Sequence, residues 1–288
     1  MYKVDNAVIM AAGTSSRFAP LSYEKPKGLI TVKGEVLIER QISQLKDAGI
    51  NEIYVVTGYK AKEFQYLADK FGVKLVHTPY YDTRNNNASI KAVENIMSNT
   101  YVCSADNYFN RNPFESEVDC AYYAAVYSDG PTDEWCMETD EDDFITSVTV
   151  GGSDAWYMLG HTFWDEKFSN TFKKILDEVY DKPETADKLW ESIYMEHLNQ
   201  LHMKMRKYPD DFIFEFDTLD ELRTFDTSYV NDTRSVILKA VARQLEVEEK
   251  DLKHITCLKD TKTTEAIGFT FDACGCHHTY LYDGGLKE

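Results

Sequence analysis

The sequence lacks features that mark membrane-spanning and small secreted proteins. It contains no run close to the ~20 apolar residues that a membrane span requires. The apolar stretch 7–12 is too short for a signal-peptide core and lies beside Asp5 and Asn6 instead of a basic segment. The six cysteines in 288 residues are scattered, unlike those of a compact disulfide framework. We therefore expect a cytoplasmic protein with reduced thiols and no membrane span.

Positive charge is also scarce. The 31 Lys and Arg residues face 49 Asp and Glu residues, giving a formal net charge of −18 at pH 7. Such a protein repels nucleic acid and anionic membranes over a Debye length of about 10 Å. We therefore expect no nucleic-acid partner. A nucleotide can still bind where a few cations and a divalent metal are concentrated.

Hydrophobic residues make up 43% of the chain and aromatic residues 13%, which is typical of a folded protein. Apolar runs alternate with amphipathic stretches, the pattern of βαβ units in a buried parallel sheet. The pattern predicts an α/β fold with a doubly wound, mostly parallel sheet. The expected strands are residues 7–11, 53–57, 73–77 and 101–105, and the expected helices are 36–48, 60–71 and 89–97, the last capped by asparagines.

Beyond residue 105 the pattern predicts an extension of this sheet and then a small appendage. A polar stretch at 231–234 places a boundary, with one domain over residues 1–230 and an α+β appendage over 231–288. The expected strands are 121–127, 144–150, 158–163 and 212–216, with helices at 168–180 and 186–201. The appendage is expected to contain a helix at 235–245 and β-hairpins from strands 255–258, 266–273 and 279–282.

A loop rich in small residues follows the first strand. It reads Ala11-Ala12-Gly13-Thr14-Ser15-Ser16-Arg17-Phe18-Ala19-Pro20-Leu21, followed by Lys25-Pro26-Lys27. Ligands of open α/β sheets collect at the carboxyl ends of strands, where small residues let backbone N–H groups approach phosphates. Arg17 and Lys27 supply local positive charge. The loop matches neither a Walker loop nor G-x-G-x-x-G.

This loop closely resembles the signature of the nucleotidyltransferases that activate sugar phosphates, phosphocholine and related acceptors. The resemblance implies a Rossmann-like, GT-A-type sheet, with nucleotide bound by residues 11–17 and Lys27. By the same resemblance, Asn85-Asn86-Asn87-Ala88-Ser89 aligns with the segment that reads base and ribose, and within it Asn87, Ala88 and Ser89 are expected to bind nucleotide. Thr57, Gly58 and Tyr59 are expected to line the same pocket. The asparagines of this segment could equally cap the following helix, so both roles stay open.

The resemblance also implies a magnesium site. Asp106 follows a predicted strand at the position of the family's metal-binding Asp. The second carboxylate is expected from Asp217, which period-2 alternation places on the same face of strand 212–216 as Glu215. Two carboxylates together with phosphate oxygens and water suffice for Mg²⁺. The implied catalytic set is Arg17, Lys27, Asp106 and Asp217.

Past residue 100 the resemblance narrows to the bacterial CTP:phosphocholine cytidylyltransferases. It rests on residues 106–114, Asp133-Glu134-Trp135, Leu189-Trp190-Glu191 with Glu196, and residues 215–222. A trimethylammonium group is best recognised by aromatic faces and carboxylates, which indicates Trp135, Glu191 and Glu215 as the acceptor cage. Trp135 and Trp190 could instead be core aromatics. The sequence departs from the family at Ser104, where a further Asp is frequent, and at Leu189, where an aromatic residue is expected.

The function implied is transfer of a cytidylyl group from CTP to phosphocholine, giving CDP-choline and pyrophosphate with Mg²⁺ as cofactor. One alternative keeps the mechanism and changes the acceptor to aminoethylphosphonate or a sugar 1-phosphate. Another is a non-catalytic, nucleotide- or choline-binding regulatory protein. Acceptor identity, oligomeric state and the role of residues 231–288 are left open by the sequence.

The appendage resembles, faintly, the opening β-hairpins of a choline kinase over residues 255–285, which suggests a truncated kinase start. A docking role, including a homodimer formed through this tail, is a further expectation. Cys274, Cys276, His277 and His278 offer zinc-type ligands, but their spacing does not match the usual zinc motifs. The sequence leaves open whether they bind a metal.

Overall fold

The computed structural model describes residues 1–261 and 266–287, which form two compact units. The first unit comprises Met1–Gly13 and Leu37–Glu215, and the second comprises Thr14–Val36 and Phe216–Glu288. The chain therefore leaves the first unit within the predicted nucleotide loop and returns to it at Leu37. The boundary predicted at residue 231 lies inside the second unit, and the separate folding of residues 231–288 stays a prediction.

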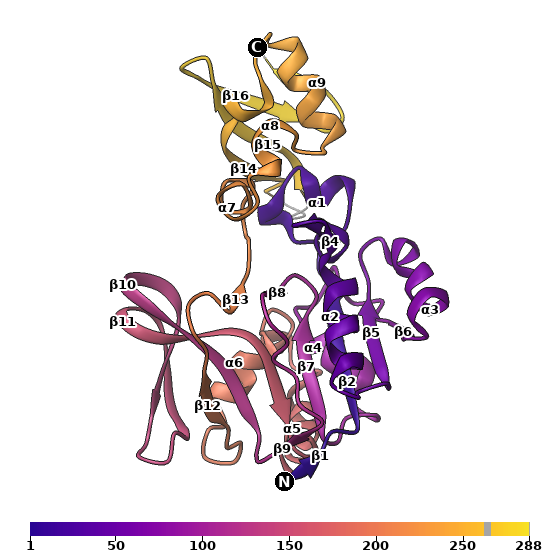
Figure 1. Ribbon diagram of the computed structural model, residues 1–288, viewed down its shortest axis with the longest axis vertical. Helices are drawn as coiled ribbons and strands as arrows, with labels where there is room; N and C mark the ends of the chain where they lie inside the picture. The colour runs from indigo at the N-terminus through magenta and orange to yellow at the C-terminus, as the bar shows by residue number, and fades with distance from the viewer. Residues whose placement is uncertain (262–265, 288) are drawn as a thin grey trace. The chain divides into compact units, whose positions relative to one another are not determined.

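The first unit is built on a seven-stranded sheet (Figure 1). In spatial order its strands are β12 (Lys204–Lys207), β10 (Tyr122–Thr139), β11 (Ile145–Trp164), β7 (Thr100–Ser104), β2 (Asn6–Ala11), β5 (Ile53–Thr57) and β6 (Lys74–His77). Strands β7, β2, β5 and β6 run parallel, as do β10 and β12, while β11 is antiparallel to both of its neighbours. The predicted α/β class with a mostly parallel sheet is confirmed.

Strand β2 occupies the centre of the parallel part because its residues are apolar on both faces. Ala7, Val8 and Ile9 are fully buried, as expected for a strand covered on both sides. Its last residues pair with Ser104 of β7 and Thr57 of β5. The carboxyl ends of three strands therefore meet, and the loops that leave them lie together.

The strands predicted at 121–127, 144–150 and 158–163 belong to one long hairpin. β10 and β11 run for 18 and 20 residues, and Figure 1 shows them as a twisted ribbon. Register shifts carry the pairing through the polar stretch between Ser128 and Trp135. Bulges of this kind let strands continue through residues that interrupt the apolar alternation, which explains the missed continuity.

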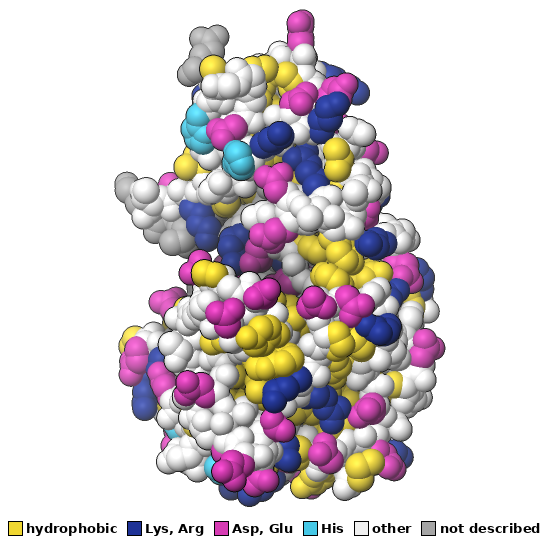
Figure 2. Space-filling view, turned by 60° about the vertical axis from the view of Figure 1, so that its left-hand side comes forward, with side chains coloured by type: hydrophobic (Ala, Val, Ile, Leu, Met, Phe, Trp, Pro, Cys, Tyr) yellow, Lys and Arg dark blue, Asp and Glu magenta, His cyan; other side chains and the backbone are white. Residues whose placement is uncertain are grey.

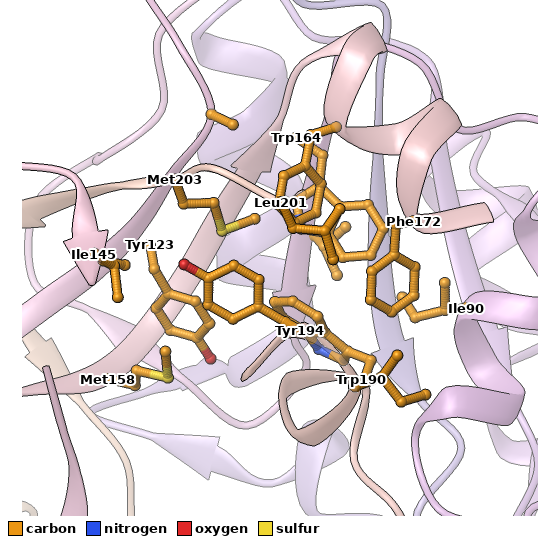
Figure 3. Packing of buried hydrophobic residues seen from close by; sticks show 14 of the residues in the cluster. Ile90, Tyr123, Ile145, Met158, Trp164, Phe172, Trp190, Tyr194, Leu201 and Met203 are labelled. Atoms are coloured by element: carbon orange, nitrogen blue, oxygen red, sulfur yellow. The ribbon is translucent and has the colours of Figure 1, made fainter. Parts of the chain in front are cut away.

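Five α-helices and two 3-10 helices belong to the first unit. They are α2 (Leu37–Asp47), α3 (Tyr66–Phe71), α4 (Asn87–Val93), α5 (Glu166–Val179) and α6 (Trp190–Met195), with η3 (Ala61–Phe64) and η4 (Pro183–Thr185). The helix predicted over 186–201 is limited to α6. Figure 3 shows Trp190 and Tyr194 of α6 within a buried cluster that also contains Trp164, Phe172 and Tyr123.

Two short strand pairs complete the first unit. β1 (Tyr2–Lys3) pairs with β9 (Glu117–Val118), and β8 (Tyr108–Phe109) pairs with β13 (Ile213–Phe214). The prediction of a strand over 212–216 was therefore too long. Because β13 ends at Phe214, strand alternation does not govern the orientation of Glu215 and Asp217.

The second unit combines the segment after Gly13 with the C-terminal part of the chain. A four-stranded antiparallel sheet confirms the predicted hairpins; its strands are β14 (Lys253–Lys259), β15 (Ala266–Ala273), β16 (Cys276–Leu281) and β17 (Gly285–Lys287). Its other elements are η1 (Ser16–Phe18), α1 (Leu21–Glu24), η2 (Lys27–Leu29), β3 (Thr31–Val32), β4 (Glu35–Val36), α7 (Leu219–Phe225), α8 (Ser228–Asn231), α9 (Val236–Gln244) and η5 (Glu249–Asp251). The likeness to a kinase stays a prediction.

Acidic side chains dominate the charged surface. Figure 2 shows Asp and Glu spread over the visible face and interspersed with Lys and Arg. Within residues 1–261 and 266–287, no helix is long and apolar enough to cross a membrane. All six cysteines, each in the described part of the chain, are free thiols.

Gly58, just after β5, packs too closely against Tyr81 and Ala12 to leave room for a side chain. This gives a test of the packing around the ends of β2 and β5. A Cβ at this position would lie 2.5 Å from Tyr81 Cβ and 2.9 Å from the Ala12 carbonyl oxygen. We expect Gly58→Ala to lower the free energy of unfolding by about 1–3 kcal/mol, as overpacking does. Urea denaturation followed by circular dichroism measures this change.

The matched control is Gly13→Ala, because no described atom lies within 4 Å of a Cβ at Gly13. Equal denaturation midpoints for the two variants would show that the packing at Gly58 is not restrictive.

Candidate active site

The nucleotide loop starts at the end of β2, where the sequence placed it. Ala11 pairs with Thr57, and the Ala12 carbonyl accepts a hydrogen bond of 2.9 Å from the Tyr59 N–H. Residues 57–59 therefore lie beside Ala11 and Ala12, as expected for segments lining one pocket. Their contact with nucleotide stays a prediction.

Arg17 and Lys27 meet at one carboxylate, that of Asp217. Arg17 Nη1 lies 2.6 Å from Asp217 Oδ2, and Lys27 Nζ lies 3.5 Å from Asp217 Oδ1. The Lys27 side chain is only 4% exposed, whereas that of Arg17 is 75% exposed. A buried ammonium requires a counter-charge, and Asp217 supplies one. Three residues of the predicted catalytic set thus form a charged cluster inside the second unit.

Asp106, the fourth member of that set, belongs to the first unit. It lies in the turn after β7, and the turn is fixed on both sides. The Ala105 N–H donates to the Met10 carbonyl at 3.0 Å. The Gln41 side-chain amide donates to the carbonyls of Ser104 and Asn107, each at 2.8 Å. Asp106 is partly exposed, so its carboxylate is held by a rigid turn beside the end of β2.

Glu191, predicted for the acceptor cage, lies among polar and aromatic groups at the start of α6. Its carboxylate accepts hydrogen bonds from Asn86 Nδ2 at 3.0 Å and from the Tyr123 hydroxyl at 3.3 Å. Burial raises the pKa of Glu191 to about 7, although these two hydrogen bonds act to lower it. This carboxyl therefore changes charge near neutral pH.

Tyr123 connects Glu191 with Glu215. Burial raises the Tyr123 pKa well above its ordinary value, and the charges of Glu191 and Glu215 raise it further. Glu191 contacts this phenol directly, and the charge of Glu215 also acts on it. Glu215 itself is exposed and accepts a hydrogen bond of 3.1 Å from Asn107 Nδ2. The structure thus brings together two of the three predicted cage residues around a tyrosine.

Trp135, the third predicted cage residue, is half-buried on β10 and packs against the cluster that contains Tyr123. Trp190 is 1% exposed and stacks on Tyr123, with ring centroids 5.8 Å apart. Trp190 is therefore a core residue. Trp135 keeps enough exposure to contact a ligand, and its role stays a prediction.

Asn86 and Asn87, at the start of α4, form a polar junction with the α6 region instead of a side-chain helix cap. Asn87 is fully buried, and its amide donates to the carbonyls of Thr185 and Lys188. Asn86 accepts from the Trp190 N–H at 2.7 Å and donates to Glu191. The predicted side-chain cap was wrong, because Asn87 bonds to the segment before α6 and Asn86 bonds to the first residues of α6. Ala88 and Ser89 are buried in α4, and base recognition by residues 87–89 stays a prediction.

Asn107 and Tyr123 were not predicted as site residues, and Asn86 was predicted only as part of the run of asparagines. Asn107 follows Asp106 directly, and Asn86 lies within the run of asparagines, so both had a local signal. Tyr123 lies in an apolar strand segment with no such signal, because the pattern there is that of a core residue.

The described residues offer carboxylate oxygens for a divalent metal, but they do not form a site in which protein side chains alone surround the ion. Within the described residues, no group of three or more His, Cys, Asp or Glu side chains could hold a metal ion, and this includes the sequence around Cys274. His277 is instead bonded to Asp272, with Nδ1 and Oδ1 2.8 Å apart. Asp106 in the first unit and Asp217 in the second each offer carboxylate oxygens, the ligand type that Mg²⁺ prefers. Their binding of one shared ion stays a prediction.

Comparison with known proteins agrees with this architecture. Residues 7–124 match the MobA-like NTP transferase domain. A choline-phosphate cytidylyltransferase of Streptococcus pneumoniae is 30% identical over 226 residues, which cover 78% of this chain and 99% of that protein. A 2-aminoethylphosphonate cytidylyltransferase of Lancefieldella rimae is 31% identical over 239 residues, covering 80% of this chain and 95% of that protein.

Solved structures give the same result. The CTP:phosphocholine cytidylyltransferase of Streptococcus pneumoniae superposes with a TM-score of 0.75 at 31% identity, over 79% of this chain and 99% of that one. The strand order and nucleotide loop described above, together with these matches over most of the chain, identify an enzyme. The chain belongs to the MobA-like nucleotidyltransferases, in the group that includes the bacterial choline-phosphate cytidylyltransferases.

Proposed function

We propose that the protein transfers a cytidylyl group from CTP to phosphocholine, releasing pyrophosphate. The observation that carries this proposal is the Glu191 carboxylate, which accepts a hydrogen bond from the Tyr123 hydroxyl, while the charge of Glu215 acts on the same phenol. Carboxylates and aromatic rings attract a quaternary ammonium group, which cannot donate ordinary hydrogen bonds. The names of the relatives from Streptococcus pneumoniae support the same pair of substrates.

At the nucleotide end, the charged cluster around Asp217 supplies the phosphate-binding groups. Arg17 and Lys27 exchange the carboxylate of Asp217 for phosphate oxygens when CTP binds. The buried ammonium of Lys27 thus keeps an anionic partner in both states, as its burial requires. Small residues 11–16 leave backbone N–H groups accessible to the triphosphate.

The reaction needs no protein nucleophile. An acceptor phosphate oxygen forms a bond to the α-phosphorus of CTP while the bond to the bridging oxygen of pyrophosphate breaks. Arg17 and Lys27 offset the repulsion between the two anions, and the fixed turn of Asp106 limits movement at the site. Asp106 and Asp217 are the residues that would hold Mg²⁺, which supplies charge neutralisation when bound.

Aminoethylphosphonate is the second candidate acceptor. The relative from Lancefieldella rimae is as similar to this chain as the choline-phosphate enzymes are. The primary ammonium group of aminoethylphosphonate donates hydrogen bonds that Glu191 and Glu215 could accept. The half-buried ring of Trp135 favours the quaternary ammonium, since aromatic faces hold it without hydrogen bonds.

We place this reaction in the cytoplasm, where reducing conditions keep thiols such as the six free cysteines reduced.

Pyrophosphate release tests the proposal directly. Purified protein with Mg²⁺ is supplied with each of four nucleoside triphosphates, combined with phosphocholine, aminoethylphosphonate or glucose 1-phosphate. We expect turnover to be fastest with CTP and phosphocholine. Faster turnover with aminoethylphosphonate would support cytidylyl transfer but contradict recognition of a quaternary ammonium group by Trp135, Glu191 and Glu215. Folded protein that binds CTP without turnover would support the non-catalytic alternative.

Asp106→Asn keeps the size of the side chain and removes its charge. We expect kcat/KM to fall by more than ~100-fold, exceeding the ~10- to 100-fold loss that outer partners of a metal site cause. Steady-state pyrophosphate release measures the loss. Asp210→Asn, at an exposed position, is the matched control and should stay within about twofold of wild type. Equal rates for both variants would exclude Asp106 from catalysis.

Glu191 predicts a pH dependence of acceptor binding. Its pKa of about 7 leaves the carboxyl mostly ionised at pH 8 and mostly protonated at pH 6. We expect the KM for phosphocholine to rise by up to ~10-fold as the pH falls from 8 to 6 and the carboxyl loses its charge. Glu191→Gln should have a high KM at both values. The ratio of the two KM values, wild type to variant, cancels titration of the acceptor phosphate, whose second pKa is near 6.

Thermal unfolding provides the folding control for Glu191→Gln. The folded pKa is raised above the ordinary 4.5, so the fold favours the protonated carboxyl. Its stabilising contribution is present below pH 4.5 and is lost as pH rises through about 7. The variant should therefore be at least as stable as wild type at pH 8.

A ratio of wild-type KM to Glu191→Gln KM that does not change with pH would exclude Glu191 from acceptor binding.

A further inference from the structure

The nucleotide loop is attached to the C-terminal part of the chain inside the second unit. Thr14, Ser15, Ser16, Arg17 and Lys27 all belong to the segment Thr14–Val36, which forms one compact unit with Phe216–Glu288. Figure 1 shows α1 of this segment, in indigo, next to orange and yellow C-terminal elements. The contacts in this unit are therefore those that can fix the loop.

Two contacts hold α1, the helix between Arg17 and Lys27. The rings of Tyr23 and Tyr282 are stacked, with centroids 3.6 Å apart and planes inclined by 7°. The Glu24 carboxylate accepts a hydrogen bond of 2.7 Å from the Ile237 N–H in the first turn of α9. A carboxylate at a helix N-terminus is favourable because it accepts a hydrogen bond from an N–H without an intrahelical partner and is attracted to the positive end of the helix dipole.

Further contacts hold the chain that follows Lys27. The Thr31 carbonyl accepts from the Tyr229 hydroxyl at 2.6 Å and from Arg234 Nη1 at 2.8 Å. The Lys33 N–H donates to Asp226 Oδ2 at 2.7 Å. The segment is thus secured on both sides of Lys27 by residues beyond 222.

We propose that Tyr282 and α9 are positioning elements for CTP, acting on the nucleotide loop through Tyr23 and Glu24. The inference rests on the proposed function and adds a role for the appendage. The match to the Streptococcus pneumoniae enzyme covers 99% of that protein but 78% of this chain, so the remainder of this chain has no counterpart there.

Hydrogen exchange on the full 288-residue chain, without substrate, tests whether Tyr282 holds the nucleotide loop in place. Tyr282→Leu removes the stack, whereas Tyr282→Phe retains it. We expect amides of residues 14–36 to exchange roughly 2- to 10-fold faster in Tyr282→Leu, the range expected from an aromatic pair. Exchange in Tyr282→Phe should equal that of wild type. Equal exchange in all three proteins would overturn the proposal.

Substrate kinetics separate positioning from general destabilisation. The acceptor residues Glu191, Glu215 and Trp135 all belong to the first unit. We therefore expect Tyr282→Leu to raise the KM for CTP by roughly 2- to 10-fold with an unchanged KM for the acceptor, and Tyr282→Phe to restore the wild-type value. Equal increases in both KM values, or a loss confined to kcat, would contradict a positioning role.

A second pair of variants covers the case in which Tyr282→Leu does not fold. Glu24→Ala removes the bond to α9, whereas Glu24→Gln retains an acceptor oxygen. Faster exchange of residues 14–36 in Glu24→Ala alone supports the proposal, and identical exchange in both variants contradicts it. Because hydrogen exchange needs no turnover, an inactive wild-type protein would refute the proposed function and leave this result decisive for loop positioning.

Discussion

The buried ammonium of Lys27 is the constraint on which the nucleotide site depends. A cation with 4% exposure requires an anion, and Asp217 supplies it from a position 190 residues further along the chain. This requirement joins the loop after β2 to the segment after β13. The second unit follows from it, because the two segments must be folded together before the phosphate-binding charges are correctly placed.

At the proposed acceptor end the buried charge is negative, that of Glu191. Glu191 is stabilised by Asn86 and Tyr123, yet burial still raises its pKa to about 7. Such a carboxylate is poorly compensated in the ligand-free protein. A cationic acceptor would supply the missing charge, so the energetic deficit itself favours binding of a positive group.

Local patterns predicted the parallel sheet well because β2 and β5 are short, apolar and bounded by polar loops. They also predicted Arg17 and Lys27 after β2 and Asp106 after β7 as site residues, and these roles stay predictions. They failed where tertiary contacts decide. The asparagine amides before α4 bond to a segment a hundred residues away. Tyr123 has the pattern of a core residue, although its hydroxyl contacts Glu191.

The division of the second unit between two distant stretches has a consequence for biosynthesis. Domains generally form as the chain emerges from the ribosome, amino-terminal parts first. Every stretch of the first unit is complete at Glu215, whereas Ile237 and Tyr282, the partners of Glu24 and Tyr23, are translated after it. The nascent polypeptide therefore carries a finished sheet and an unsecured loop until Ile237 and Tyr282 have emerged. Premature termination would release a chain whose acceptor end is folded and whose nucleotide end is not.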